Sequence, residues 1–239
     1  PSQGGRLGSE CMDVAFTKIL HFSLAHLTKT SLGLFESDAE ACFDRIVMRM
    51  AFMSFKAMGA PPKPLQMWEH TLYHIRHELR TGYSESTGSY SYTATSPIFG
   101  PGQGSRGGVA AVCAMMTILL RAFDRLRHGS TFCDPAQTKF VKTISKMFID
   151  DASNFVNNFL QGLHLPTDQL ELTLLLSGDA QIWERLLHTS GGKLRPDKCL
   201  YYLILWLFDE EGDATMEPPD EDTQLTITTG RSLDPQHIA

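Results

Sequence analysis

Two adjacent carboxylates constrain this chain more than any other feature. They are Asp150 and Asp151, in the segment 148–151 with the sequence Phe-Ile-Asp-Asp. An apolar run begins near Phe140, and a second, alternating run covers 153–159. Two such runs around a short break predict a β-hairpin with both acids at its tip. Because neighbouring residues of a regular strand point to opposite faces, the turn is what lets both carboxylates approach one small volume.

Carboxylates this close repel each other, and the repulsion is relieved when one takes up a proton or when both bind a cation. The usual cation where phosphate is handled is Mg²⁺, which prefers hard oxygen ligands. The other interpretation of Asp150 and Asp151 is a turn exposed to water, since Asp is a favoured turn residue. The rest of the chain must decide between the two.

The composition is that of a globular protein. At 239 residues the chain can bury a full core, and 42% of its residues are hydrophobic and 20% charged. Its longest uncharged apolar stretches, 107–120 and 200–208, are too short to span a bilayer, so we expect no membrane partner. The five cysteines include no C-x-x-C pair, and this pattern indicates neither a disulfide framework nor a zinc site. We therefore expect an intracellular protein, of the nucleus or the cytoplasm.

The net charge of −6 is concentrated in one segment. Residues 209–222 hold eight acids and no base, which leaves 19 acids against the 21 bases of the whole chain. The acidity therefore belongs to this stretch, which we interpret as an open turn or a disordered insert, and the body is close to neutral. A near-neutral body neither favours nor excludes nucleic acid, because binding to phosphates needs clustered base rather than net base.

Local patterns predict the remaining elements. Apolar periodicity predicts helices over 12–27, 44–59, 64–80, 109–121 and 168–190, a hairpin over 82–94, and strands over 32–35, 200–208 and 223–229. Asp44 is a suitable N-cap for the second helix, and Gly59 a suitable stop. Asp168 and Glu171 are spaced as a capping pair.

The predicted helix over 64–80 carries three histidines on one face. His70, His74 and His77 are spaced by four and three residues, and imidazoles so spaced could hold a metal in a different kind of metal-dependent enzyme. That hypothesis requires an acid near the histidines. The alternative is a solvated or packed helix face, since the H-E-x-x-H arrangement is absent.

Two more stretches have the context of functional residues. Asp38 follows the predicted strand 32–35 where the chain turns into a helix, a position at which α/β proteins place reacting groups; the alternative is a turn or cap. The glycine- and proline-rich segment 97–108 runs directly into the apolar helix 109–121. Its bare backbone would let a ligand or template lie against the chain, and the alternative is a flexible linker.

The order and contexts of these stretches resemble motifs A, B and C of reverse transcriptases. Motif A has the form D-x-x-x-x-[F/Y]-D, which Asp38, Phe43 and Asp44 match. Motif B has a Gln-Gly pair, matched at 103–104, and motif C has aromatic-x-Asp-Asp, matched at 148–151. The segment 191–199 is similar to motif D, and 3–9 is similar to the end of the fingers motif upstream of motif A. The closest similarity is to the domain carried by retroelements, non-LTR or related.

The resemblance implies a fold and an activity. The fold is α+β, with a polymerase palm-type antiparallel sheet and helices packed on one face. The activity is RNA-directed DNA synthesis by two-metal nucleotidyl transfer. Its cofactors are two Mg²⁺ ions, with Mn²⁺ as an alternative, and its partners are an RNA template, a DNA primer and deoxynucleoside triphosphates.

The resemblance also assigns metal-binding and catalytic residues. Asp38 and Asp150 would bridge the two metals, and Asp151 would lie nearby and be less directly involved. Lys198 would donate a proton or charge to the leaving pyrophosphate.

Four further residues would contact the nucleotide. Phe43 would lie beneath the incoming sugar, with Ala39 beside it in motif A, and Gln103 and Gly104 would line the nucleotide and the template.

The resemblance covers residues 3–206. It predicts a reverse-transcriptase-like palm with the end of the fingers over 1–208, followed by an acidic insert and a partly disordered tail over 209–239. Because the chain opens on Pro1 and most of the fingers and a thumb are not recognisable, we expect an incomplete fragment. The alternative function is a catalytically inactive retroelement remnant, or a nucleic-acid-binding module that keeps the palm fold.

Overall fold

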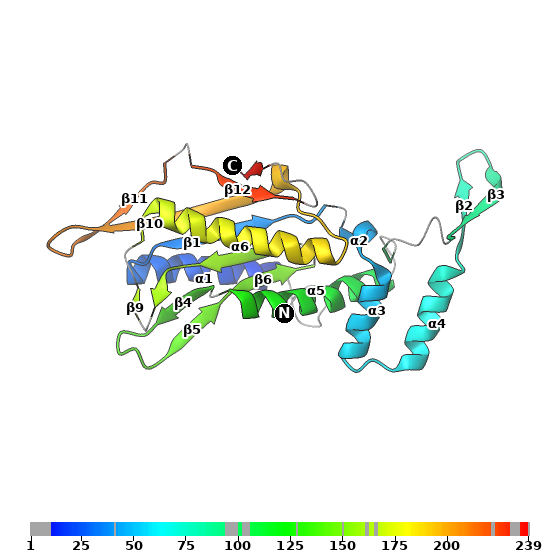
Figure 1. Cartoon of the computed structure of the whole chain (residues 1–239), viewed down its shortest axis with the longest axis horizontal. Helices are drawn as coiled ribbons and strands as arrows, with labels where there is room; N and C mark the ends of the chain where they lie inside the picture. Colours follow the sequence, from blue (N-terminus) through cyan, green and yellow to red (C-terminus); the bar gives the residue numbers. More distant parts are fainter. Residues whose placement is uncertain are drawn as a thin grey trace.

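The computed structural model of the chain combines helices with antiparallel sheets (Figure 1). This confirms the predicted α+β class, whereas the palm-type arrangement stays a prediction. The structure describes residues 11–40, 42–93, 100–101, 106–127, 129–149, 151–160, 163–164, 167–220, 223–229 and 235–238.

The helices are α1 (Cys11–Thr28), α2 (Cys42–Arg45), α3 (Met48–Ala57), α4 (Pro62–Tyr73), α5 (Arg106–Leu126), α6 (Gln169–Thr189) and the 3-10 turn η1 (Pro196–Lys198). The strands are β1 (Leu32–Ser37), β2 (Arg76–Arg80), β3 (Glu85–Ser91), β4 (Ser130–Cys133), β5 (Phe140–Thr143), β6 (Ser145–Phe148), β7 (Asp151–Val156), β8 (Phe159–Leu160), β9 (Leu163–His164), β10 (Leu200–Phe208), β11 (Ala214–Glu217), β12 (Leu225–Thr228) and β13 (Pro235–Ile238). Within the described ranges, no helix is long and apolar enough to cross a membrane.

The largest sheet in the described part of the chain has five strands, in the order β11-β10-β1-β7-β6. The central strand is β1, which pairs antiparallel with β10 on one side and with β7 on the other. Its Phe35 lies opposite Tyr201 of β10 and Asn154 of β7. A run of small and apolar residues suits this position, because a central strand is covered on both faces.

One face of the sheet packs against α6. Gly33, Phe35 and Ser37 alternate onto this face, and the indole Nε1 of Trp183 in α6 donates a 3.1 Å hydrogen bond to Ser37 Oγ. A Cβ at Gly33 would lie 3.0 Å from the Val156 side chain of β7, which is a tight contact, and 3.4 Å from the Leu176 side chain of α6, which is an ordinary one. Phe123 of α5 packs edge-on against Trp183, with 5.6 Å between ring centroids, so α5 and α6 share one core.

The other face of the sheet contacts α1. Lys18 of α1 forms a 2.6 Å ion pair with Glu36 of β1, and the buried His21 ring stacks on Phe155 of β7 with 4.3 Å between centroids. Burial lowers the pKa of His21, so the imidazole is neutral at pH 7. Helices therefore lie on both faces of the sheet, with α6 and its partner α5 on one and α1 on the other, so the predicted packing of the helices on one face only is wrong.

A buried ion pair joins α5 to α6. The Arg127 guanidinium, at the C-terminal end of α5, pairs with the Asp179 carboxylate of α6, whose side chain is 1% exposed. Arg127 Nη2 also donates to Leu175 O at 3.2 Å. Because an unpaired buried carboxylate is costly, this pair fixes the register between the two helices.

The predicted helix over 44–59 is divided in two. Asp44 lies inside α2 and is not an N-cap; α3 begins after Val47, and no side chain caps it. The break has a tertiary cause, since Val47 N donates to Ser190 O and Ile46 O accepts from Gly100 N. The predicted stop is confirmed, because α3 ends at Ala57 and Gly59 has a φ of +85°.

The predicted helix over 64–80 ends early. Helix α4 stops at Tyr73, and the residues that follow form β2, which pairs with β3 in a hairpin that is exposed on both faces. This hairpin and α4 extend away from the main sheet (right in Figure 1). The helical prediction is wrong beyond Tyr73 because cross-strand pairs, such as His77 with Tyr90, replace the helical contacts.

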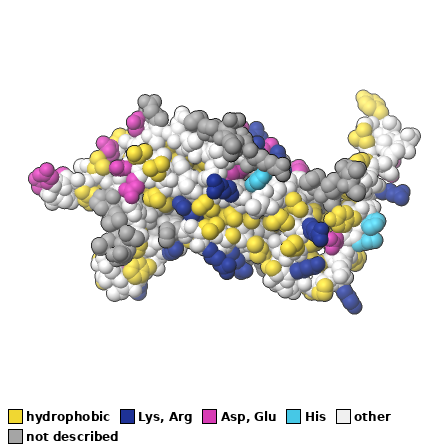
Figure 2. All heavy atoms as spheres, viewed as in Figure 1, with side chains coloured by type: hydrophobic (Ala, Val, Ile, Leu, Met, Phe, Trp, Pro, Cys, Tyr) yellow, Lys and Arg dark blue, Asp and Glu magenta, His cyan; other side chains and the backbone are white. Residues whose placement is uncertain are grey.

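Several other elements match their predictions. The Asp168 carboxylate accepts a 2.7 Å hydrogen bond from Glu171 N and caps α6. Strands also form at 32–37, 200–208 and 225–228. Residues 214–217 pair with β10 as strand β11, so this part of the acidic segment is not an open turn. The acidic side chains gather at the far end of the β10–β11 hairpin (left in Figure 2).

Candidate active site

Three of the predicted site residues line one pocket. Asp38, Asp151 and Lys198 surround a space of about 200 Å³ at the end of strands β1 and β7, together with Lys18 and Glu36. Residues from three distant parts of the sequence therefore meet where the central strands end.

The pairing of β1 places Asp38. Ser37, the last residue of β1, lies opposite Ala152, so the next residues along the two strands are Asp38 and Asp151. Beyond the strand the backbone stays paired, because Arg195 N donates to Asp38 O at 3.0 Å and Glu40 N donates to Lys193 O at 2.8 Å. These bonds hold the segment that carries Lys198 against Asp38.

The ammonium of Lys198 faces the Asp38 carboxylate. Nζ lies 3.4 Å from Oδ2, with 53% of the lysine side chain and 29% of the aspartate side chain exposed. An ion pair this exposed contributes little to stability, so Lys198 can exchange its partner for another anion at small cost. Lys18 balances Glu36 at the other side of the pocket.

The hairpin carrying the acids forms as predicted. Phe148 of β6 pairs with Asp151 of β7 at the tip of the hairpin. Ile149 has a φ of +58°, a conformation that costs a β-branched residue about 1–2 kcal/mol. Strain of this kind is often found at functional sites. Asp150 itself lies outside the described residues.

The donors of the pocket suit a hard cation. Its acids are Glu36, Asp38 and Asp151, and oxygen ligands of this type favour Mg²⁺ or Mn²⁺ over zinc. Burial raises the pKa of the adjacent Cys199 thiol to about 11, so this thiol stays protonated at pH 7. Among the residues that the structure describes, no three His, Cys, Asp or Glu side chains form a metal-binding group. The predicted metal set includes Asp150, and it stays a prediction.

Two of the four predicted nucleotide-binding residues, Ala39 and Phe43, are among the described residues. Ala39 is buried and forms a β-bridge with Leu194. Phe43 is half-buried and packs against the main core. Gln103 and Gly104 lie outside the described residues.

Two glycines of the glycine-rich segment serve the packing of the protein itself. Gly100 has a φ of +72°, and a Cβ there would lie 2.0 Å from Phe43 O. A Cβ at Gly107 would lie 2.5 Å from the Trp68 indole. The bare backbone at these two positions therefore admits protein atoms, and the start of α5 is anchored against α2 and α4.

The histidines do not gather around an acid. His70 and His74 lie side by side at the end of α4, with 4.0 Å between ring centroids. His77 lies on β2 and contacts Tyr92 at 5.3 Å. None of the three lines the acidic pocket, and the condition of the histidine-metal hypothesis is not met among the described residues.

Two charged residues of the pocket were missed by sequence reasoning. Lys18 comes from α1, and its partner Glu36 lies in β1. The available signal was Glu36 itself, a charged residue in an otherwise small and apolar strand. The position of Lys18 had no local signal, because it depends on the packing of α1 against the sheet.

Taken together, the fold and the pocket define an α+β protein with an acidic pocket at the end of its central strands. No known protein-family model matches the chain, and no curated protein matches its sequence.

The strain at Ile149 can be measured with two substitutions that remove the same side-chain packing. Ile149→Gly relieves the strain of the positive φ, and Ile149→Ala does not. The free energy of unfolding, measured in urea, should therefore be about 0.5–1 kcal/mol higher for Ile149→Gly than for Ile149→Ala. At Ala110, an exposed position in α5, Ala110→Gly should instead lower stability by about 1 kcal/mol. An Ile149→Ala variant as stable as Ile149→Gly would show that the hairpin tip is not strained.

Proposed function

We propose that this chain is the polymerase domain of a retroelement, which extends a DNA primer on an RNA template by two-metal nucleotidyl transfer. The observation that carries the proposal is the pocket shared by Asp38, Asp151 and Lys198. These residues belong to the segments that resemble motifs A, C and D. The resemblance requires these three residues to lie close together. Local sequence patterns alone do not require this, so their proximity supports the proposal.

The chemistry requires anionic ligands and a cation near the leaving group. Two bound divalent ions, about 3.5–4 Å apart, would lower the pKa of the primer 3′-hydroxyl and neutralise charge on pyrophosphate. Asp38 and Asp151 supply carboxylates from the ends of two neighbouring strands, and the resemblance adds that of Asp150, the residue before Asp151 in the sequence. Lys198 holds its ammonium beside Asp38, where it could stabilise the charge that develops on pyrophosphate.

The surrounding fold is consistent with a polymerase palm. The acids lie at the end of an antiparallel sheet, and α5 and α6 support one face of this sheet as a common core. Phe43 lies five residues after Asp38 and is half-buried at the start of α2, where part of its ring remains available to a sugar.

A second candidate function is a nucleic-acid-binding module without catalysis. The observation that favours it is the charge balance of the pocket, in which Lys198 pairs with Asp38 and Lys18 with Glu36. A pocket in which two of the three acids are paired with its own lysines has less need of metal. The two candidates differ in whether the carboxylates are required for turnover.

Primer extension on an RNA template in Mg²⁺ tests the assignment. Asp38→Asn and Asp150→Asn should each reduce extension at least about 100-fold, because each removes a bridging carboxylate. Asp151→Asn should leave measurable activity. Glu78→Gln, on the exposed strand β2, removes the same charge and should leave extension unchanged.

The assay is run with this chain and with a version extended upstream, with melting temperatures to verify folding. Equal residual activity in the Asp150 and Asp151 variants would reverse their assigned roles. Binding of primer–template with no extension by either version of the chain would favour the binding module.

The role of Phe43 is tested by sugar selection. If its ring lies beneath the incoming sugar, Phe43→Ala should raise the ratio of ribonucleotide to deoxynucleotide incorporation by about tenfold or more, because a steric clash is removed. Phe55→Ala is the matched control, since Phe55 is also half-buried against the main core but lies on α3. A lowered melting temperature with an unchanged ratio for Phe43→Ala would assign this ring to core packing alone.

A further inference from the structure

We propose that the outer edge of β6 binds an extended acidic segment of a partner protein, which adds a strand to the main sheet. This inference does not depend on the proposed polymerase activity. It concerns the sheet edge, and its test does not use catalysis.

The register of the hairpin exposes backbone groups on this edge. Phe148 pairs with Asp151 at the tip of the hairpin. Further along the same two strands, Phe155 N donates to Ile144 O at 2.9 Å. Backbone groups of an antiparallel strand alternate in direction, so Phe148, Lys146 and Ile144 point toward β7. The N–H and C=O groups of Ser145 and Met147 therefore point away from it. No described strand pairs with β6 on that side.

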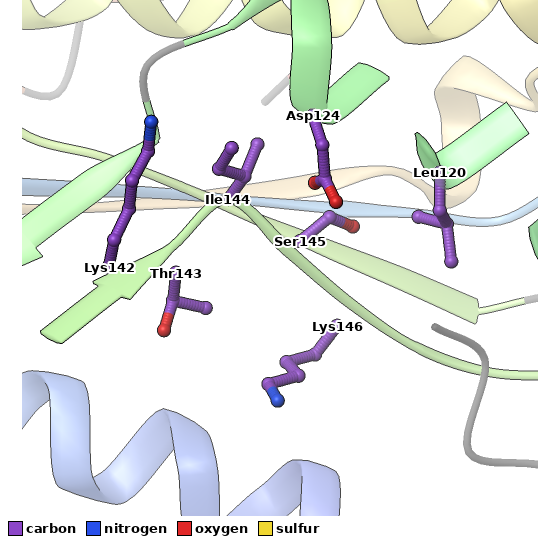
Figure 3. A pocket seen from close by; sticks show the side chains of 7 residues that line it. All are labelled: Leu120, Asp124, Lys142, Thr143, Ile144, Ser145 and Lys146. Carbon is purple, nitrogen blue, oxygen red and sulfur yellow. The ribbon is translucent and has the colours of Figure 1, made fainter. Parts of the chain in front are cut away.

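A pocket lies along the same edge. Its volume is about 280 Å³, and it is lined by Leu120 and Asp124 of α5 and by residues 142–146. In Figure 3 the Asp124 side chain descends from α5 toward Ser145, whereas Lys146 extends to the opposite side of the strand. An added strand would thus find side-chain contacts on both faces, as alternate residues of an extended peptide require.

One buried polar group in this pocket lacks a partner. The Ser145 side chain is only 9% exposed, and its Oγ has no hydrogen-bond partner within the described part of the chain. Buried hydroxyls are nearly always satisfied. The hydroxyl is covered by the protein itself, so a peptide laid along β6 would pair with the outward N–H and C=O groups of Ser145.

The two lysines of the pocket favour an acidic occupant. Lys142 and Lys146 both line the pocket, and no described acid lies within ion-pair distance of either. Lysines at a sheet edge oppose pairing with an identical edge, because the like charges would meet. They attract an acidic strand. Asp124, on the side of α5, favours a hydroxyl or amide donor from the residue that faces it.

Among the described strands, none of the chain's own supplies this occupant. The acidic segment contributes β11, which forms the opposite edge of the same sheet, four strands away from β6 in the strand order. A second copy could offer that edge, and this becomes an outcome of the test. The occupant that the pocket favours is an extended partner segment with acids on one face and small hydroxyl residues on the other.

A fluorescent peptide of the sequence Glu-Thr-Glu-Thr-Glu-Thr provides the probe, with the whole chain as receptor. The peptide should bind in an anisotropy titration, and Lys146→Glu should weaken binding at least about tenfold, since it reverses a contacting charge. Lys139→Glu changes the net charge equally but lies outside the pocket, and it should have little effect.

Amide hydrogen exchange separates strand addition from simple charge attraction. The peptide should slow exchange at Ser145 and Met147, whose N–H groups point outward, and leave the already paired Lys146 and Phe148 unchanged. A peptide that is N-methylated at the alternate residues whose N–H groups would face β6 should not bind, because it cannot donate to the strand. Binding without new protection at Ser145 and Met147, or no binding of the acidic peptide, would overturn the proposal. So would self-association of the chain that Lys146→Glu abolishes, since the edge would then belong to a second copy.

Discussion

The position of β1 between β10 and β7 is the constraint on which the rest of the structure depends. Each side chain of β1 is committed by this pairing to one of two faces, with Ser37 toward α6 and Glu36 toward α1. A register shift of one residue would exchange the faces and bury the charged Glu36 against the core. The same register brings Asp38 and Asp151 to one end of the sheet. The acidic pocket is therefore a direct consequence of strand pairing.

The backbone beyond the strand end gives the pocket its third predicted residue. Hydrogen bonds join Asp38 and Glu40 to Arg195 and Lys193, and they continue the sheet by a few residues without forming a regular strand. Lys198 follows on the 3-10 turn and reaches the Asp38 carboxylate. Because this ion pair is partly exposed, it is a weak and exchangeable contact. Under the proposed polymerase function, a lysine held near the acids by an exchangeable contact would suit the release of pyrophosphate.

The elements that could be predicted from the sequence are those whose structure is determined by a local pattern. The hairpin 145–156, the capped helix α6 and the strand β10 each follow from alternation, capping residues or an apolar run within one segment. Sequence patterns failed to predict the element boundaries that depend on contacts between distant parts of the chain. The break between α2 and α3 depends on two hydrogen bonds, from Val47 N to Ser190 O and from Gly100 N to Ile46 O, and the end of α4 depends on the pairing of β2 with β3. For the site, the resemblance named Asp38, Asp151 and Lys198, whereas Lys18 became visible only through the packing of α1.

The central claim is that Asp38 and the hairpin acids form one divalent-cation site, and Mn²⁺ tests it most directly. Paramagnetic broadening of amide resonances is measurable for a chain of 26.6 kDa. At low Mn²⁺ concentrations broadening should centre on Asp38, Asp151 and Lys198, and Asp38→Asn should remove it while the spectrum otherwise stays folded. Broadening centred on His70 and His74 or on the acidic turn 209–213, and unaffected by Asp38→Asn, would contradict the account.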